Sequence, residues 1–316
     1  MDYSIPSDIR VLDLNSDGFA DRMYAADMGG QVWRFDITNG NQPSALVAGG
    51  VVAQLGAAGL LNPTAADIRR FYYAPDVALV IDREFNFIHI GIGSGHRAHP
   101  NATVNHDEFY AIRDYATFGP RTQTQYNQFT PVTVNDLVDV TADVAASVPQ
   151  GSPGWRLSLN DGGWRGEKVL APARTFNGQV FVSTYRPGTS GITCEPALGT
   201  TRQYVMSIFN ASPVTNLDGS VDDYNDDGIV DPQDLQLTDR YREYEGPPPP
   251  ETVFFFPGPE GDVDGDGDID DDYAFSLSCI ASNSCLDETP CQGLRCFPNG
   301  VQRFPVRTFW SQDDIE

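Results

Sequence analysis

An acidic loop between two predicted strands constrains the fold of this chain more than any other feature. In the loop, residues 13–21, oxygen-bearing side chains recur at every second position, and a glycine, Gly18, stands at the sixth. This alternation around a glycine turn is typical of EF-hand-like loops, which bind hard cations such as Ca²⁺. An Asp-Gly hairpin turn is the alternative, but it accounts only for Asp17 and Gly18. The spacing therefore predicts a calcium site with the ligands Asp13, Asn15, Asp17, the carbonyl of Phe19, and Asp21.

The residues after this loop indicate an architecture. A glycine turn at Gly29 and Gly30 precedes an aromatic strand, residues 31–35, which ends in Asp36 and is followed by Gly40. This pattern resembles the strand-and-turn repeat of quinoprotein-type β-propellers. Together with the acidic loop, it is similar to the C-terminal propeller domain of the PilY family, whose members act in type IV pilus biogenesis at pilus tips and on the cell surface.

Further segments continue the resemblance in the order of the family's strands. They are a glycine-rich strand end, an aromatic-Ala-x-Arg-Asp motif, a Gly-Trp strand, a Gly-Glu-x-Val strand and a Phe-x-x-Thr-x-x-Pro strand before a cysteine. Here they stand at Gly91 to Gly95, Phe109 to Asp114, Gly154-Trp155, Gly166 to Val169, Phe181 to Pro187, and Cys194. The resemblance implies an all-β fold of quinoprotein-type, β-propeller-like blades over residues 1–212, as part of a larger propeller.

Residues 213–282 form a second predicted unit, rich in aspartate and interrupted by a proline run at 247–250. Its first acidic loop resembles the calcium loop of dockerins and precedes a predicted short helix over 234–244. A disordered acidic linker is the alternative for this unit. The predicted ligands of the first loop are Asp223, Asn225, Asp227, the carbonyl of Ile229, and Asp234.

A second dockerin-like loop begins about 39 residues after the start of the first. Its twelfth position is Tyr273, so Asp270 or Asp272 must supply the last carboxylate. Carboxylates held about 4 Å apart repel by about 4 kcal/mol at an effective dielectric near 20, and a bound cation reverses that repulsion. Calcium is therefore expected first as a structural ion. The predicted ligands are Asp262, Asp264, Asp266, Asp268 and Asp270.

The charge balance excludes some classes of partner. Asp and Glu number 44 against 20 Lys and Arg, which gives a net charge of −24. Such a charge argues against nucleic acid and anionic membrane surfaces as partners. Much of the excess lies in the three acidic loops, although a salt-adapted source organism would also explain it. No apolar segment approaches the length of a membrane span.

The cysteines indicate an oxidising compartment. Four of the five stand within 18 residues of each other, and neither a Cys-x-x-Cys motif nor a histidine partner marks them as a zinc site. We therefore expect disulfides. The tail over residues 283–316 is expected to end in a closing strand, because residues 303–312 resemble the aromatic final strand of the PilY family. Because no signal peptide opens the sequence, we expect a fragment of an exported protein. The candidates for disulfides are Cys194, Cys279, Cys285, Cys291 and Cys296.

Histidines offer a weaker alternative metal site. His96, His99 and His106 could together hold zinc, but a polar loop between two strands is the expected structure. No sequence motif of a hydrolase nucleophile, a metalloprotease or a phosphate-binding loop occurs in the chain. We therefore expect that the protein is not an enzyme. A calcium-dependent quinoprotein enzyme is the alternative suggested by the propeller repeat, but the paired cysteines of those enzymes are missing.

Taken together, the sequence predicts a calcium-binding, PilY-like protein of the type IV pilus tip or outer-membrane surface. By resemblance, it would act in pilus biogenesis, adhesion and the balance of extension and retraction. Its expected partners are minor pilins at the pilus tip and host or surface ligands, and its expected cofactor is Ca²⁺. A dockerin-anchored extracellular binding module is a further alternative, which cohesin binding would reveal.

Overall fold

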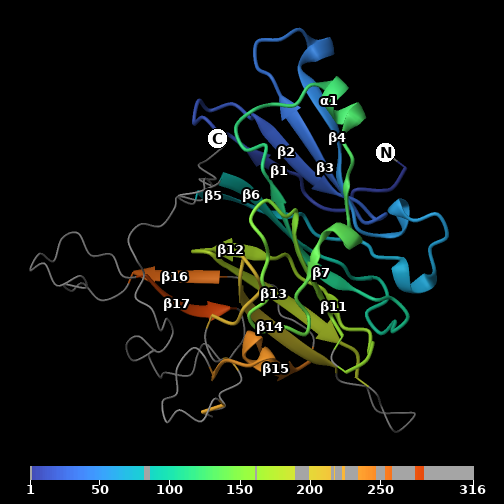
Figure 1. Ribbon diagram of the computed structural model, residues 1–316, viewed down its shortest axis with the longest axis vertical. Coiled ribbons are helices and arrows are strands. Elements are labelled where there is room, and N and C mark those ends of the chain that lie inside the picture. The colour runs from blue at the N-terminus through green and yellow to red at the C-terminus, as the bar shows by residue number, and fades with distance from the viewer. Residues whose placement is uncertain are drawn as a thin grey trace, which may run out of the picture.

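The computed structural model consists almost entirely of β-strands, which confirms the predicted all-β class (Figure 1). Three five-stranded sheets follow one another along the chain, and a separate pair of strands comes after them. The structure describes residues 2–81, 86–160, 162–188, 199–214, 217, 223–224, 234–246, 253–257 and 275–280.

The first sheet is an antiparallel meander of four strands with a fifth added in parallel. Its strand order follows the sequence as far as β4, and the short β8 then pairs beside β4. A 3-10 turn, η1 (Pro43–Ala45), lies between β3 and β4. The strands are β1 (Arg10–Leu12), β2 (Arg22–Ala26), β3 (Gln31–Ile37), β4 (Val47–Gln54) and β8 (Val132–Thr133).

The glycine turn that the sequence predicts connects β2 to β3. Asp27 holds this turn, because its carboxylate accepts hydrogen bonds from the Gly29 and Gln31 amides and from the Trp33 indole, at 2.9, 3.0 and 2.8 Å. Gly30 has a positive φ of 78°, and a Cβ at this position would lie 2.6 Å from the backbone of Gly56. Only glycine satisfies both conditions.

The second sheet repeats the arrangement of the first. Four antiparallel strands are followed by β9, which pairs in parallel with β10. The segment before this sheet holds two 3-10 turns, η2 (Ala57–Gly59) and η3 (Ala65–Asp67). The strands are β5 (Asp76–Ile81), β6 (Asn86–Gly93), β7 (Glu108–Asp114), β10 (Gly154–Ser158) and β9 (Val138–Asp139).

The connection from β7 to β10 returns to the first sheet before it completes the second. It includes the capped helix α1 (Gln123–Gln128), which contacts β4, and the 3-10 turn η4 (Val134–Asp136). Gln123 exchanges hydrogen bonds with the backbone of Gly49 on β4, both at 3.1 Å. The same connection contributes β8 to the first sheet, so it ties the first two sheets together.

The third sheet has a divided edge. Two short strands, β11 and β12, both pair with β13, and β14 and β15 follow on the other side. The strands are β11 (Lys168–Val169), β12 (Arg174–Phe176), β13 (Gln179–Arg186), β14 (Thr200–Ser207) and β15 (Tyr241–Glu245).

The predicted helix over residues 234–244 is wrong. The chain forms one 3-10 turn, η6 (Leu237–Arg240), and then enters β15 at the edge of the third sheet. Pairing with β14 outweighs local helix preference here, because it brings Glu243 within 2.6 Å of Arg202 and the Arg202 guanidinium over the Tyr241 ring. The third sheet therefore extends beyond residue 212.

The last two strands, β16 (Val253–Pro257) and β17 (Phe275–Ile280), form an antiparallel pair with a register shift between Phe254 and Phe255. Cys279 lies on β17. The other predicted disulfide residues, most of the second predicted unit and the closing strand of the tail lie outside the described residues. The corresponding cysteines are Cys194, Cys285, Cys291 and Cys296.

The buried apolar side chains of the described residues form two clusters, one on each face of the second sheet. Strand β7 shows how they are divided. Tyr110 and Ile112 belong to the cluster shared with the first sheet, and Phe109 and Ala111 belong to the cluster shared with the third. Successive side chains of a strand point to opposite faces, so β7 is buried on both. The three sheets therefore pack face to face, as propeller blades do. Among the described residues, no helix has the length and apolar character needed to cross a membrane.

Candidate functional site

The acidic loop predicted to bind calcium connects β1 to β2, at the outer end of the first sheet. Gly18 has a φ of 87° and Ser16 a φ of 62°, so the loop turns sharply around the predicted glycine. A hydrogen bond of 2.8 Å from the Asp21 amide to the Leu12 carbonyl closes the base of the loop. The local sequence therefore produces the turn that the ligand alternation requires.

The side-chain oxygens of the loop point inward toward its own backbone. The amide of Asp17 lies 3.2 Å from an Asp13 carboxylate oxygen and 2.9 Å from the Asn15 amide oxygen. Asp13 also accepts a hydrogen bond of 2.8 Å from Gly18. Slight desolvation raises the pKa of Asp13, but the hydrogen bonds from loop amides outweigh it and hold that pKa below its usual value. Asp13 and Asn15 thus converge on one point.

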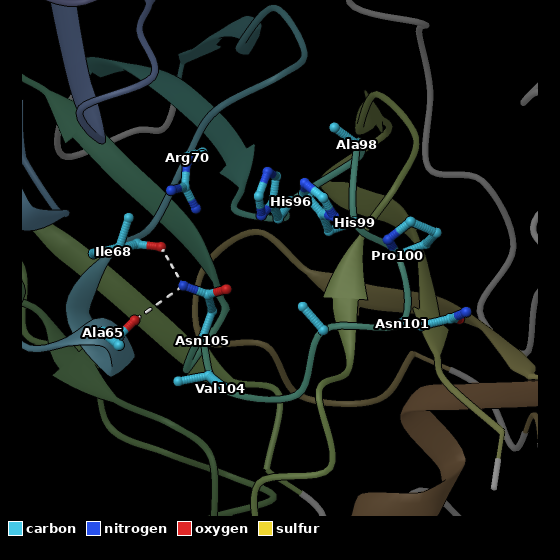
Figure 2. Close-up of a pocket in the computed structure, with 11 residues that line it drawn as sticks. Ala65, Ile68, Arg70, His96, Ala98, His99, Pro100, Asn101, Val104 and Asn105 are labelled. Carbon is cyan, nitrogen blue, oxygen red and sulfur yellow. Dashed lines mark hydrogen bonds between the residues drawn. The ribbon is translucent and has the colours of Figure 1, made fainter.

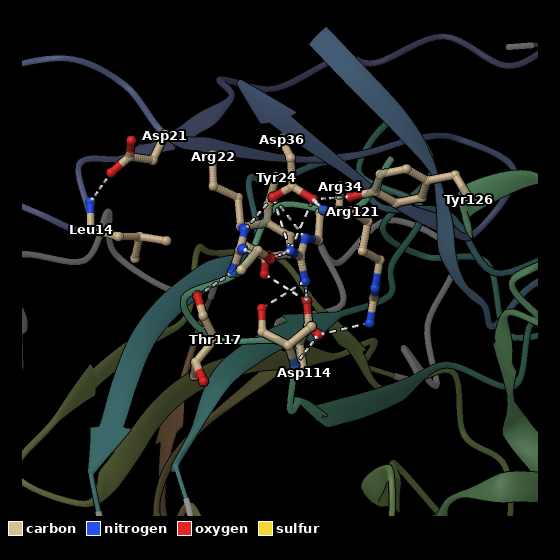
Figure 3. Close-up of polar contacts among 12 residues, drawn as sticks. Leu14, Asp21, Arg22, Tyr24, Arg34, Asp36, Asp114, Thr117, Arg121 and Tyr126 are labelled. Atoms are coloured by element: carbon tan, nitrogen blue, oxygen red, sulfur yellow. Dashed lines mark hydrogen bonds and ion pairs between the residues drawn. The ribbon is translucent and has the colours of Figure 1, made fainter. Parts of the chain in front are cut away.

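Asp21 and Asp17 complete the loop. Asp21 Oδ2 accepts a hydrogen bond of 2.7 Å from the Leu14 amide (Figure 3), and Asp17 Oδ1 accepts one of 2.8 Å from the Phe19 amide. The Phe19 side chain is 64% exposed. A Phe19 contribution to a metal site would therefore come from its carbonyl, as the sequence predicts.

The donor set of this loop fits calcium chemically, since it consists of carboxylate, amide and carbonyl oxygens. Among the described residues, however, no three or more side chains of His, Cys, Asp and Glu lie close enough together to bind one metal ion. Hydrogen bonds from the loop amides to the carboxylate oxygens reduce the repulsion between those oxygens. Calcium binding at this loop remains a prediction.

The first dockerin-like loop is described only at its two ends. The Tyr224 amide donates a hydrogen bond of 2.9 Å to Asp234 Oδ1, and Asp234 is buried. The residue after the first predicted ligand thus bonds to the last one, as Leu14 does to Asp21. The remaining predicted ligands of both dockerin-like loops lie outside the described residues, namely Asn225, Asp227, Ile229, Asp262, Asp264, Asp266, Asp268 and Asp270.

The three histidines considered for zinc do not come together. The rings of His96 and His99 lie 4.5 Å apart, whereas His106 stacks on Trp164 at 4.0 Å. His89 is fully buried in β6, where burial and the nearby Arg113 lower its pKa to about 3. The alternative of a three-histidine zinc site is therefore wrong for this fold.

A buried ionic network between the first and second sheets was not predicted. Its centre is Arg34 on β3, which donates to both oxygens of Asp36 at 2.9 Å and to Asp114 at 2.7 Å (Figure 3). Asp36 is the last residue but one of β3 in the first sheet, and Asp114 is the last residue of β7 in the second. Two aspartates singled out as motif ends thus share one guanidinium.

A second arginine fixes the chain segment that leaves β7. Arg22 donates to Asp36 at 2.7 Å and also to the carbonyls of Thr117 and Gly119, at 2.7 and 3.1 Å. Arg34 donates to the carbonyl of Gly119 as well, at 3.1 Å. Because these carbonyls belong to the connection between sheets, the two arginines position that connection as well as the strands.

Two tyrosines complete the network. Tyr24 donates to Asp114 at 2.8 Å, and Tyr126 on α1 donates to Asp36 at 2.7 Å. Burial raises the pKa of Asp36, but the Arg121 amide and the charges of Arg34 and Arg22 outweigh it, so that pKa lies below its usual value. Asp36 is therefore ionised and fully paired. The network therefore links the strands of the first sheet to the end of β7 in the second.

Comparisons with known proteins agree with this architecture. The chain is similar in structure to the C-terminal domain of PilY1 from Pseudomonas aeruginosa, with a TM-score of 0.51 and 18% sequence identity. The match covers 80% of this chain and 57% of that one, so the chain spans little more than half of that domain's length. No protein-family model and no curated protein matches the sequence. At this level of identity, the likeness concerns the fold, which is all-β and propeller-like.

Proposed function

We propose that this chain is part of a PilY-like, calcium-binding protein of the type IV pilus, located at the pilus tip or on the outer surface of the cell. In this role it binds other proteins and surfaces, with minor pilins and host or surface ligands as partners, and catalyses no reaction. The observation that carries the proposal is the structural similarity to the C-terminal domain of PilY1 over 80% of the chain.

Two features of the described residues support this proposal beyond the similarity in fold. The motif ends Asp36 and Asp114, on which the family resemblance partly rests, meet at Arg34 and hold neighbouring blades together. The acidic loop leads into β2, which pairs with the aromatic strand β3 in the same sheet. The motifs therefore have physical roles in one architecture and are not scattered matches.

The calcium site is proposed at residues 13–21. Within the described part of the chain, Asp17 Oδ2 and Asp21 Oδ1 accept no hydrogen bond, so each remains available to a cation. Asp13 and Asn15 already converge on one loop amide. A bound Ca²⁺ would then hold the β1–β2 connection in place of the hydrogen bonds within the loop.

We expect saturating calcium to raise the melting temperature of the purified chain relative to EDTA. A ligand at 100 times its dissociation constant adds about 2.7 kcal/mol to the free energy of unfolding. The double substitution Asp13→Ala and Asp21→Ala should leave the protein folded. It should abolish the part of the difference in melting temperature between calcium and EDTA that comes from this loop. Asp8→Ala is the matched control, because it removes an exposed carboxylate outside the loop. If the double variant and the wild type show the same calcium dependence, the loop is only an acidic turn.

The pilus role is tested in cells that produce the full-length protein. Deletion of its gene should reduce the number of surface pili and twitching motility, and antibodies against residues 1–212 should label pilus tips by immunogold electron microscopy. Complementation should restore both properties, and Asp223→Ala in the dockerin-like loop should complement as well as the wild type. Unchanged pili and motility after deletion, without label on pili, would contradict the proposed function.

A further inference from the structure

A pocket lies on the side of the second sheet where β6 ends. Its volume is about 570 Å³, and its walls come from the segment after η3 and from the loop between β6 and β7 (Figure 2). Apolar side chains such as Ile68 and Val104 make up part of the lining, and Val104 is 60% exposed, so the pocket opens to solvent. Neither the calcium loop nor the ionic network contributes to this pocket.

The polar side of the pocket is basic. Arg70, His96 and His99 all line it, and Figure 2 shows them next to one another along one wall. Within the described residues, their side chains make no hydrogen bond or ion pair, and no carboxylate is among the lining residues. On a chain with a net charge of −24, a guanidinium beside two imidazoles, with the buried Asp107 as its carboxylate neighbour, is a local exception.

The fold positions these groups. The Gly95 amide donates to the Arg70 carbonyl at 3.0 Å, which holds Arg70 next to His96. The His96 ring stacks against Tyr72, with ring centroids 6.2 Å apart. The arrangement is therefore built by backbone pairing and ring stacking and does not depend on long, free side chains alone.

A buried lysine fixes the opposite wall. Lys168 on β11 donates to the carbonyls of Pro100 and Ala102 at 2.7 and 2.9 Å and also to that of Gly166. Lys168 is fully buried, and burial lowers its pKa to about 8, against the opposing effect of Asp107 and Glu167. Because the ammonium holds three carbonyls from two segments, the loop that lines the pocket is fastened to the third sheet.

Asn105 supplies an acceptor at the base of the pocket. Its amide nitrogen donates to the carbonyls of Ala65 and Ile68, at 3.0 and 2.9 Å, which fixes the orientation of the side chain. Figure 2 shows its amide oxygen pointing away from both carbonyls. This oxygen can accept a hydrogen bond from a ligand hydroxyl.

These features define a ligand by its chemistry. A guanidinium fork matches a carboxylate through two parallel hydrogen bonds. A single guanidinium suits a monoanion better than a doubly charged phosphate, and among the described lining residues Arg70 alone carries a permanent positive charge. The acceptor oxygen of Asn105 and the apolar lining suit a hydroxylated carbon skeleton.

We propose that this pocket binds a small hydroxylated carboxylate, such as a uronic acid sugar, with Arg70 and His96 at the carboxylate and Asn105 at a hydroxyl. The site is additional to the proposed pilus role and is tested independently of it on the purified chain.

Binding should strengthen as the pH falls from about 7 to about 5, where histidine gains its proton. Burial, Arg70, His99 and Lys168 together lower the pKa of His96, so its ring is neutral at pH 7 without a ligand. Asp107, a buried carboxylate, interacts with Lys168, Arg69 and Arg70, and burial raises its pKa to about 6. A bound carboxylate adds a negative charge beside His96 and so favours its protonated form.

The experiment is isothermal titration calorimetry with D-galacturonate, D-galactose and inorganic phosphate as probes. We expect galacturonate to bind, galactose to bind at least about tenfold more weakly, and Arg70→Met to weaken galacturonate binding about tenfold. His96→Phe keeps a flat ring beside Tyr72 and should weaken the pH dependence, leaving the part that comes from protonation of Asp107. Arg174→Met, which deletes a 41% exposed arginine outside the pocket, is the matched control and should bind as the wild type does.

A second measurement needs no variant. In imidazole NMR spectra of the wild-type protein, galacturonate should raise the pKa of a pocket histidine, and galactose should leave it unchanged. Three outcomes would each overturn the proposal. In the first, galactose or phosphate binds as tightly as galacturonate does. In the others, Arg70→Met and Arg174→Met lose equal affinity for galacturonate, or galactose shifts the histidine pKa as galacturonate does. The absence of both binding heat and a histidine shift would overturn it as well.

Discussion

Replacing Arg34 with methionine is expected to lower the free energy of unfolding by about 3–5 kcal/mol, the usual cost of breaking a buried ion pair from one side. Arg34 is fully buried and is bonded to Asp36 and Asp114. Methionine retains much of the apolar stem but none of the donors. Two carboxylates would then keep only Arg22 and Arg121 as charged partners, besides the two tyrosines, in a site that water does not reach freely.

Urea unfolding followed by tryptophan fluorescence measures this loss. The control is Arg174→Met, which removes an equal charge from a 41% exposed side chain whose ion pair with the mostly buried Asp76 is long, at 4.0 Å, and should change stability by no more than about 1 kcal/mol. Adding Asp114→Asn to Arg34→Met should recover part of the loss, because it removes one uncompensated charge. A change of less than about 1 kcal/mol in Arg34→Met would show that the network does not hold the blades together.

Replacing Trp155 with alanine is expected to lower the free energy of unfolding by about 3–5 kcal/mol. Trp155 lies on β10, is fully buried, and packs with Phe109 at a centroid distance of 5.9 Å. Its indole donates to the Ile208 carbonyl at 2.8 Å, which links the second sheet to the segment after β14 in the third. Alanine would leave a cavity between two blades and an unpaired carbonyl.

Two further variants separate packing from hydrogen bonding at this position. Trp155→Phe keeps an aromatic ring but loses the indole donor, so it should cost about 1–3 kcal/mol. Trp164→Ala is the matched control, since Trp164 is only partly buried and stacks on His106, and it should cost about 0.5–1.5 kcal/mol. Urea unfolding monitored by far-UV circular dichroism suits all three. Equal stability of the alanine variants at 155 and 164 would contradict the view that Trp155 joins the blades.

Local patterns predicted much of the first two sheets. The glycine-rich strand end that begins at Gly91 belongs to β6, the motif from Phe109 to Asp114 belongs to β7, and the aromatic strand over residues 31–35 belongs to β3. Strand preference, period-two burial and a glycine turn act over a few residues, so they can be read without knowledge of the partner strand. The turn at Gly18 was predictable for the same reason, because its backbone conformation excludes most other residues.

Pairing between distant segments was not predictable in the same way. Residues 234–244 carry no strong strand signal, and their structure is decided by the free edge of β14 and by Arg202. The pocket combines Arg70 with His96 only because Gly95 pairs with the Arg70 carbonyl. Such contacts depend on how separate segments come to lie side by side, which a propensity within one segment does not encode.

The family resemblance was enough to predict the all-β class and to single out the two motif aspartates, and neighbouring residues were enough to predict the turn at Gly18 in the loop over residues 13–21. What those aspartates do depends on how the sheets pack. Asp36 and Asp114 lie 78 positions apart in the chain, and only the packing of two sheets brings both to Arg34. A buried charge is stable only when paired, and a pair so distant in sequence exists only once the blades have packed.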